Sequence, residues 1–434
     1  MESLYPQQQG GVARFTVQGG IANPLSRSDN LEKSRRGLWS FSSTPLVLTY
    51  GAFPLVDIGL RVLGRPPFRS WIDGAWILLF LLATLQLILR LERPLRIPRV
   101  PTGLLVAAPL VLLVSLVTLE GPSFVSATYA MELKPVFYLV VAWIWVLAFG
   151  FPSRRAFIQA GLLLSALIAM ELVSGSALHR SIFRPIGSGE VNYDACLILL
   201  SLCVGLADES VSGFQLCLLC AGILATFSRT GAMAVMVILL ICRRVPSYAK
   251  LAAIGFSAGS AVLSFLVRGL DSSLSQVDRY LMWASAIEMF YRNPSGLAFG
   301  YGVGAPLPAE IPPGLTDLFS MQDQSLSLSG TYAFEYHSMW LRMEISWGIV
   351  VLALILTTAI AWILQSRVLL RRYLALALCL EGLSMGVVYL SNVGIPFFIL
   401  VMLACQDRAA PQELSARRGK RAAFRVSTNS RDPV

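Results

Sequence analysis

The sequence predicts an all-α membrane protein that crosses the bilayer about twelve times, and three observations carry this prediction. Of the 434 residues, 55% are hydrophobic and only 14% are charged, whereas soluble domains carry about 25% charged residues. The mean hydropathy is +0.65. Apolar runs of roughly 20 residues, the length that a transmembrane helix needs, recur along the chain. A single membrane domain, 45–406, is therefore expected between two polar tails.

Both tails are expected to be cytoplasmic. Residues 1–44 are polar and lack the early apolar run of a cleavable signal peptide, which predicts a disordered tail. Residues 407–434 hold seven Lys/Arg against three acids and predict a basic tail. The formal net charge of +10 indicates contact with an anionic membrane surface, because cytoplasmic segments of membrane proteins accumulate Lys and Arg. Nucleic acid is not expected as a partner.

Apolar runs mark the individual spans, and clusters of Lys and Arg predict which of their ends are cytoplasmic. Basic clusters lie at Arg90–Arg99, Arg154–Arg155, Arg243–Arg244 and Arg367–Arg372. The expected single spans are 45–64, 74–91, 103–119, 135–151, 156–174, 191–207, 249–267, 344–364, 371–388 and 392–406.

The run 213–242 is too long for one span. Its thirty residues would form a helix of about 45 Å, against a hydrocarbon core of about 30 Å. The chain must also cross an even number of times between the cytoplasmic clusters at Arg155 and Arg243, and 156–174 and 191–207 supply two crossings. The run is therefore expected to form two short helices that meet at Arg229 on the outer face. Twelve spans result, with one large extracytoplasmic loop, 268–340, between the ninth and the tenth.

Four groups of residues on the predicted outer face are candidates for chemistry. Arg229 at the apex of two helices is either an anion site, with amides of a helix start beside it, or a snorkelling arginine. Arg180 and Arg184 precede a glycine-containing stretch where backbone can approach a ligand, and the alternative is a plain turn.

The other two groups lie in the large loop. Arg279 belongs to a predicted helix that is capped by Asp278, and the apolar residues of this helix share one face, namely Trp283, Ile287, Phe290 and Tyr291. A helix lying on the membrane surface is the structural alternative. His337 stands close to Glu335, and histidine with a nearby carboxylate suits a general base near neutral pH. His337 could equally be a structural residue.

No metal or cofactor is expected. All seven cysteines fall in or at the edges of apolar runs, and no Cys/His cluster with metal-ligand spacing occurs in the sequence. Arginine forks suit phosphate oxygens. The residues therefore favour an extracytoplasmic site for a phosphorylated substrate that is carried by the membrane.

Four segments, in this order, resemble the O-antigen ligase and Wzy-type polysaccharide polymerase superfamily. They are RPIGSGEVNYDA, FSRTGAMAV, DRYLMWASAIEMF leading to FGYGVGA, and HSMWLRMEISWG. The resemblance covers the span pattern and is clearest from Arg184 to about Trp347. It implies that Arg180, Arg184, Arg229 and Arg279 bind the diphosphate of an undecaprenyl-diphosphate-linked glycan.

The resemblance favours a polymerase over a ligase. His337, Ser338 and Gly348 match the spacing of the ligase signature, but Val351 stands where Gly, Thr or Tyr is expected. The implied enzyme is a metal-independent glycosyltransferase that polymerises lipid-linked oligosaccharide repeats into exopolysaccharide or O-antigen. His337 would be its base, with Glu335 assisting. It would act on the periplasmic face of a bacterial inner membrane, among membrane lipids and other proteins of polysaccharide assembly and export.

Two alternatives stay open. The first is an O-antigen ligase that transfers the glycan to lipid A-core. The second, from a different class, is a polysaccharide-lipid transporter or flippase. Internal repeats and broken midplane helices are typical of transporters, and no repeat is evident here. Charged residues inside the expected spans keep transport open, namely Asp57, Glu171, Asp194 and Glu381.

Overall fold

The computed structural model divides the chain into two compact units, Met1–Ser40 and Phe41–Val434. Residues 1–39 of the predicted N-terminal tail lie outside the described residues, as does the tail beyond residue 407. Helix begins at Phe41, inside the stretch expected to be tail. The described residues are 40–63, 70–89, 97–117, 126–179, 185, 191–208, 211–243, 245–267, 273–304, 306–309 and 331–407.

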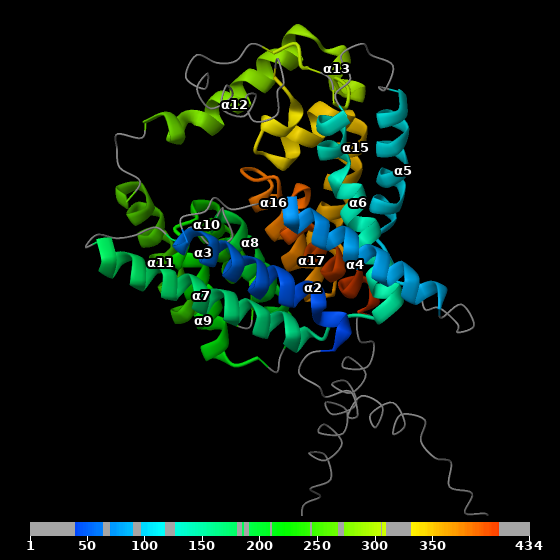
Figure 1. Ribbon diagram of the computed structural model, residues 1–434. Coiled ribbons are helices and arrows are strands. Elements are labelled where there is room, and N and C mark those ends of the chain that lie inside the picture. The colour runs from blue at the N-terminus through cyan, green and yellow to red at the C-terminus, as the bar shows by residue number, and fades with distance from the viewer. Residues whose placement is uncertain are drawn as a thin grey trace, which may run out of the picture. The chain divides into compact units, whose positions relative to one another are not determined.

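Within these ranges the chain forms helices and no strand, so the predicted all-α class is confirmed for the described part (Figure 1). The α-helices are α2 (Thr44–Val47), α3 (Phe53–Val62), α4 (Ser70–Ile88), α5 (Thr102–Val117), α6 (Ser126–Phe149), α7 (Arg154–His179), α8 (Val191–Ala207), α9 (Gly213–Ala225), α10 (Arg229–Ile241), α11 (Ser247–Val267), α12 (Ser273–Arg292), α13 (Ser295–Phe299), α15 (Met339–Gln365), α16 (Leu369–Glu381) and α17 (Ser391–Gln406). Short non-α turns are η1 (Phe41–Ser43), η2 (Leu48–Ala52), η4 (Ala333–Glu335) and η5 (Val387–Tyr389).

Four helical stretches among the described residues are long and apolar enough to cross a membrane. They are Phe41–Leu60, Thr128–Phe149, Arg154–Leu178 and Met339–Gln365. Shorter apolar helices accompany them, namely Ile72–Ile88, Thr102–Val117, Val191–Ala207, Gly213–Ala225, Arg229–Ile241 and Ser391–Gln406. These helices agree with a helical membrane protein.

Three expected spans differ most from the helices in the structure. The expected span 135–151 corresponds to Ser126–Phe149 and so begins earlier. The expected span 344–364 begins earlier, at Met339, because the Ser338 side chain caps the helix by accepting the Leu341 amide at 3.4 Å. The expected span 371–388 stops being helical at Glu381. A turn follows, and its carbonyls at Gly382 and Met385 accept the Met339 amide at 2.9 and 3.1 Å. The backbone carbonyls after α16 thereby find hydrogen-bond donors at the start of α15, although the helix does not continue.

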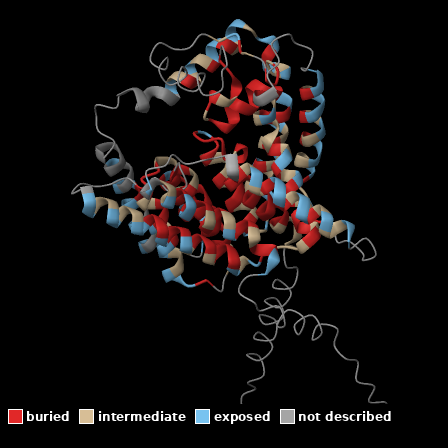
Figure 2. Ribbon diagram, viewed as in Figure 1, coloured by how far each residue is buried: buried red, intermediate tan, exposed pale blue. Residues whose placement is uncertain are grey.

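The core is built around helices that are apolar on every side. Almost all residues of α8 and α17 are buried (Figure 2), as expected for helices without a polar face. α8 packs against α7, α9 and α16, and α17 packs against α6. Small residues allow this close approach. A Cβ atom on Gly222 of α9, for example, would lie 2.2 Å from the Ser165 hydroxyl of α7.

The run 213–242 forms two helices, as predicted. α9 ends at Ala225, and the Thr226 hydroxyl donates to the Ile223 carbonyl at 2.6 Å. Phe227 then adopts a left-handed conformation (φ +53°), which is rare for an aromatic residue. The Ser228 side chain accepts the Gly231 amide at 3.2 Å and caps α10. The chain therefore restarts a helix at Arg229.

Helix α15 is kinked at Gly348, where the segment after α12 lies against it. Gly348 has φ +76° and ψ 176°, so the helical dihedrals are interrupted. The Ile345 carbonyl accepts the Tyr301 amide at 2.8 Å. Gly300 (φ +81°) faces the kink, and a Cβ on Gly300 would lie 2.5 Å from the Ser346 carbonyl oxygen. Only glycine fits at both contact positions, because the backbones touch and φ is positive.

Candidate functional site

The predicted site residues divide into those whose side chains are described and those whose side chains are not. Arg229 is half-buried at the first position of α10, and His337 is half-buried just before the Ser338 cap of α15. Arg279 lies within α12, but its side chain is outside the described part. Arg180 and Arg184 lie outside the described residues altogether. Their predicted roles stay predictions.

The N-terminal ends of α8 and α10 lie together. An added Cβ on Gly231 of α10 would be 3.3 Å from the Ala195 Cβ of α8, so the two first turns are in close contact. Asp194 of α8 is fully buried beside this contact. Each helix start carries a positive partial charge. Arg229 therefore begins its helix close to the start of α8, which carries the buried Asp194.

Helix α16 brings His337 to the same end of the bundle. It packs against α8, α10 and α15. The Gly382 carbonyl, one residue after α16, accepts both the Met339 amide at 2.9 Å and the Ser338 hydroxyl at 3.1 Å. Glu381, the last residue of α16, is fully buried. We name this cluster the polar end of the bundle: Asn192, Asp194, Arg229, His337 and Glu381.

The polar end combines one arginine and one histidine with buried acids, and these residues come from four different elements. Asn192, Asp194 and Glu381 are each at least nine-tenths buried. Ionisable groups at such positions are costly in a membrane and mark functional sites. From the sequence, Asp194 and Glu381 were recognised only as charges inside spans. Their proximity to Arg229 depends on how α8, α10 and α16 pack, which the sequence pattern does not specify.

Glu335 serves the short turn that leads to His337. It is buried, and one of its carboxylate oxygens accepts the Tyr332 amide at 3.1 Å. Burial raises the pKa of the next residue, Tyr336, while its hydrogen bond with Ser285 (3.4 Å) lowers that pKa and the Glu335 charge raises it. The Tyr336 phenol therefore stays protonated at neutral pH. Glu335 fixes the loop, and its expected assistance to His337 stays a prediction.

A buried ion pair next to the polar end was missed from the sequence. The Arg342 Nε of α15 donates to both carboxylate oxygens of Glu132 on α6 at 3.0 Å, and the Ser346 hydroxyl donates to the same carboxylate at 2.9 Å. The Arg342 guanidinium lies 3.7 Å from the ring centroid of Tyr389. Arg342 stands in the HSMWLRMEISWG segment, five residues after His337. Arg342 inside an apolar helix was the sequence feature that could have predicted this ion pair, because a charge in apolar surroundings needs a partner.

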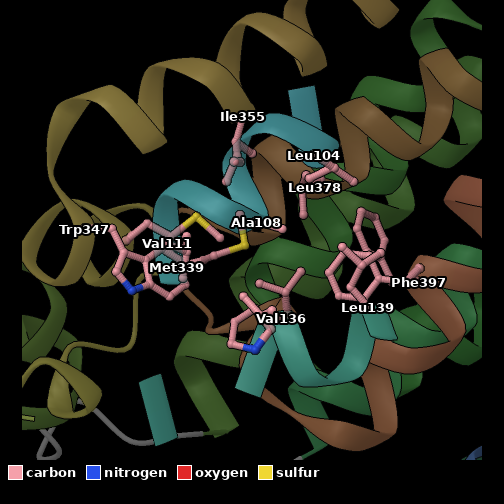
Figure 3. A pocket seen from close by; sticks show the side chains of 15 residues that line it. Leu104, Ala108, Val111, Val136, Leu139, Met339, Trp347, Ile355, Leu378 and Phe397 are labelled. Carbon is pink, nitrogen blue, oxygen red and sulfur yellow. The ribbon is translucent and has the colours of Figure 1, made fainter. Parts of the chain in front are cut away.

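An apolar crevice is lined by side chains of α15 from Met339 onward and by residues of neighbouring helices (Figure 3). Its volume is about 60 Å³, and all of its lining residues are apolar. Met339, Trp347 and Ile355 line it from α15. The sixteen steps from Met339 to Ile355 correspond to at most about 24 Å of helix. The half-buried residues at its rim come from α5 and α6, namely Leu104, Ala108, Val136 and Leu139. The lining suits apolar groups, and the volume has room for only a small part of a hydrocarbon chain.

Helix α12 buries one face and leaves part of the expected apolar face exposed. Met282, Ala286 and Met289 are the buried residues, and they pack with Tyr336 and Ile345. Of the residues expected on one apolar face, Trp283 and Phe290 pack partly against this cluster, whereas Ile287 and Tyr291 are 60% and 89% exposed. The exposed apolar residues agree with a helix that lies on a membrane surface.

The chain matches no protein-family model and no curated protein. The likeness to the polymerase and ligase superfamily therefore rests on the four sequence segments. Within the described ranges, no group of three or more His, Cys, Asp or Glu residues could hold a metal ion.

Proposed function

We propose that the protein is a membrane glycosyltransferase that polymerises oligosaccharide repeats carried on undecaprenyl diphosphate. The observation that carries the proposal is the polar end: Arg229 at a helix start, with His337 on an adjacent element, in an otherwise apolar bundle. The apolar crevice that starts two residues after His337 supports a lipid-linked substrate. The family resemblance supplies the identity of the lipid.

In the proposed reaction, Arg229 and the amides at the start of α10 bind the diphosphate oxygens. A hydroxyl of one lipid-linked repeat attacks the anomeric carbon of the growing chain. As the new C–O bond forms, the bond to the diphosphate breaks, and undecaprenyl diphosphate leaves with the electron pair. The His337 imidazole accepts the proton of the attacking hydroxyl. Attack from the face opposite the leaving group inverts the configuration at the anomeric carbon.

The proposal includes the topology of twelve spans with the polar end on the periplasmic face. One structural observation supports it. Segments with predicted cytoplasmic charges meet at the opposite end of the bundle: the Arg371 Nε donates to the Ala404 carbonyl at 2.9 Å, and Arg154 pairs with Asp407. In a cysteine-free variant, we expect Thr230→Cys to react with a membrane-impermeant maleimide added to intact spheroplasts, and Ser247→Cys to react only after lysis. Labelling of Thr230→Cys only after lysis would contradict the topology.

If His337 is the base, the wild-type rate should fall toward acid pH, and the rate of the His337→Ala variant should be lower but should not fall in this way. Polymer formation is measured from purified lipid-linked repeat across pH 5 to 9, a range chosen because an imidazole titrates near neutrality. The wild-type rate should fall toward acid pH, because a protonated imidazole cannot accept a proton. His337→Ala should be slower by about 10²-fold and should lack this acid limb, while still inserting in the membrane.

The products distinguish the proposal from its alternatives. Polymer made by the wild-type enzyme from lipid-linked repeats alone supports the polymerase. Glycan transfer that occurs only after lipid A-core is added would identify a ligase instead. Movement of intact lipid-linked repeats across vesicles without any new glycosidic bond would identify a transporter. A His337→Ala variant that keeps both the rate and the pH profile would show that His337 is structural.

A further inference from the structure

A second pocket lies at the other end of the bundle, far along the helices from the polar end. It has a volume of about 430 Å³, within the range of about 300–1,000 Å³ that is typical of small-molecule sites. Four segments line it: the chain entering α5, the C-terminal half of α15, the first turn of α16 and the end of α17. Arg99, Thr358, Trp362 and Arg371 are its principal polar and aromatic residues.

The charge of this pocket is positive. The charged residues in its lining are Arg99 and Arg371, and no carboxylate lines it. Both arginines line the same pocket, together with Cys405. The nearest described acid, Asp407, forms an ion pair with Arg154. Two neighbouring cations repel each other, so an anion placed between them is stabilised by both.

The two arginines are arranged differently. Arg371 is held in place: its Nε donates to the Ala404 carbonyl at 2.9 Å, and its Nη2 donates to the Cys405 and Asp407 carbonyls at 3.3 Å. Its guanidinium carbon also lies 5.8 Å from the Trp362 ring centroid. Arg99 is exposed and makes no hydrogen bond or ion pair with the described residues. One cation is therefore fixed, and the other can turn toward a ligand.

The position of the pocket points to a lipid. Trp362 and Thr358 belong to a helix long and apolar enough to cross a membrane, and tryptophan is enriched where such helices meet the headgroups. Basic pockets between membrane helices on the cytoplasmic side suit anionic headgroups. A planar guanidinium binds phosphate oxygens in a bidentate manner. Half-buried Ala361 and Trp362 offer an apolar wall for the glycerol and the first part of the acyl chains.

We propose that this pocket binds the phosphodiester headgroup of an anionic phospholipid, with the phosphate between Arg99 and Arg371. The inference uses the proposed topology, which puts this end of the bundle on the cytoplasmic side. It does not depend on the proposed glycosyltransferase activity, because none of the residues involved belongs to the polar end. A bound lipid would join the entrance of α5 to the ends of α15 and α17.

The test uses the full-length protein in an uncharged detergent, with added phosphatidylglycerol or phosphatidylcholine. Native mass spectrometry measures the bound lipid, and the thermal unfolding midpoint reports its effect on stability. Phosphatidylglycerol should bind and raise the midpoint in a saturable manner, and phosphatidylcholine should do so more weakly. Arg99→Gln should weaken the apparent affinity for phosphatidylglycerol by about tenfold, since one charge-assisted contact is lost.

Two further variants and one soluble probe complete the test. Ala361→Phe fills the pocket without changing its charge and should weaken phosphatidylglycerol binding as much as Arg99→Gln does. Arg367→Gln removes an exposed arginine near the same helix ends that does not line the pocket, and it should bind lipid normally. Equal binding by all of these proteins would overturn the proposal. Inorganic phosphate is the soluble probe. If it raises the thermal unfolding midpoint as much as phosphatidylglycerol does at the same concentration, the proposal is overturned, because the ligand would then be a soluble anion.

Discussion

Arg229→Ala is expected to abolish polymer formation, with a loss of about 10³-fold or more, while the protein still inserts and folds. Arg229 begins α10 and is half-buried beside the start of α8. In the proposed reaction its charge neutralises the diphosphate as negative charge develops on the leaving group. Electrostatic stabilisation of this kind acts most strongly in the transition state, so its removal should lower the rate more than His337→Ala does.

The replacement by lysine separates charge from geometry. Arg229→Lys should recover little activity, because a point charge does not reproduce the planar fork that contacts two phosphate oxygens. Arg243→Ala is the matched control: this exposed arginine follows the opposite end of the same helix and should leave the rate unchanged. The measurement is polymer formed from purified lipid-linked repeat, together with membrane yield. Near-normal polymer from Arg229→Ala would exclude the assigned role.

Loss of either partner of the buried ion pair between Glu132 and Arg342 is expected to destabilise the protein strongly. Glu132 is 1% exposed, and the Arg342 side chain is 10% exposed. Removing one partner leaves the other charge buried without compensation, which costs about 3–5 kcal/mol. Glu132→Gln and Arg342→Met should each lower the thermal unfolding midpoint of the purified protein. The double variant should be less destabilised than the sum of the two, since neither charge is left alone.

A second ion pair on the same helix provides the control. Lys134, two residues after Glu132, donates to Asp73 of α4 at 3.2 Å, with side chains 31% and 46% exposed. Solvent screens such a pair, so Lys134→Ala should cost only about 0–1 kcal/mol. Equal destabilisation by Lys134→Ala and Glu132→Gln would contradict the special importance of the buried pair. Additive effects in the double variant would show that Glu132 and Arg342 act independently.

The helical class and the break at Arg229 could be predicted from the sequence because both depend on local properties. A thirty-residue apolar run exceeds the bilayer thickness, and Ser228 followed by Gly231 provides a helix start. The end of α16 at Glu381 could not be predicted from hydropathy, because apolar residues continue beyond it. The chain leaves the helix there to bond with the start of α15, and that contact is tertiary.

The residues of the site could be predicted only in part, because their grouping depends on tertiary contacts. Arg229 and His337 stood out because arginine and histidine are rare in apolar surroundings. The relation of Asp194 and Glu381 to them arises from the packing of α8, α10 and α16, segments separated by many residues. The apolar face of α12 could be predicted, but not that Met282, Ala286 and Met289 are buried toward α15 while Ile287 and Tyr291 are exposed. Apolar spacing indicates a face but not which neighbour covers it.

The brevity of α9 and α10 has a consequence for the bilayer around them. Each helix has thirteen residues and rises about 20 Å, whereas a hydrocarbon core is about 30 Å thick. In the proposed topology, the lipids beside this pair must compress to match the shorter apolar length. The resulting dimple lowers the headgroup plane toward Arg229. A lipid-borne diphosphate that diffuses into the thinned zone would reach the arginine without leaving its own leaflet.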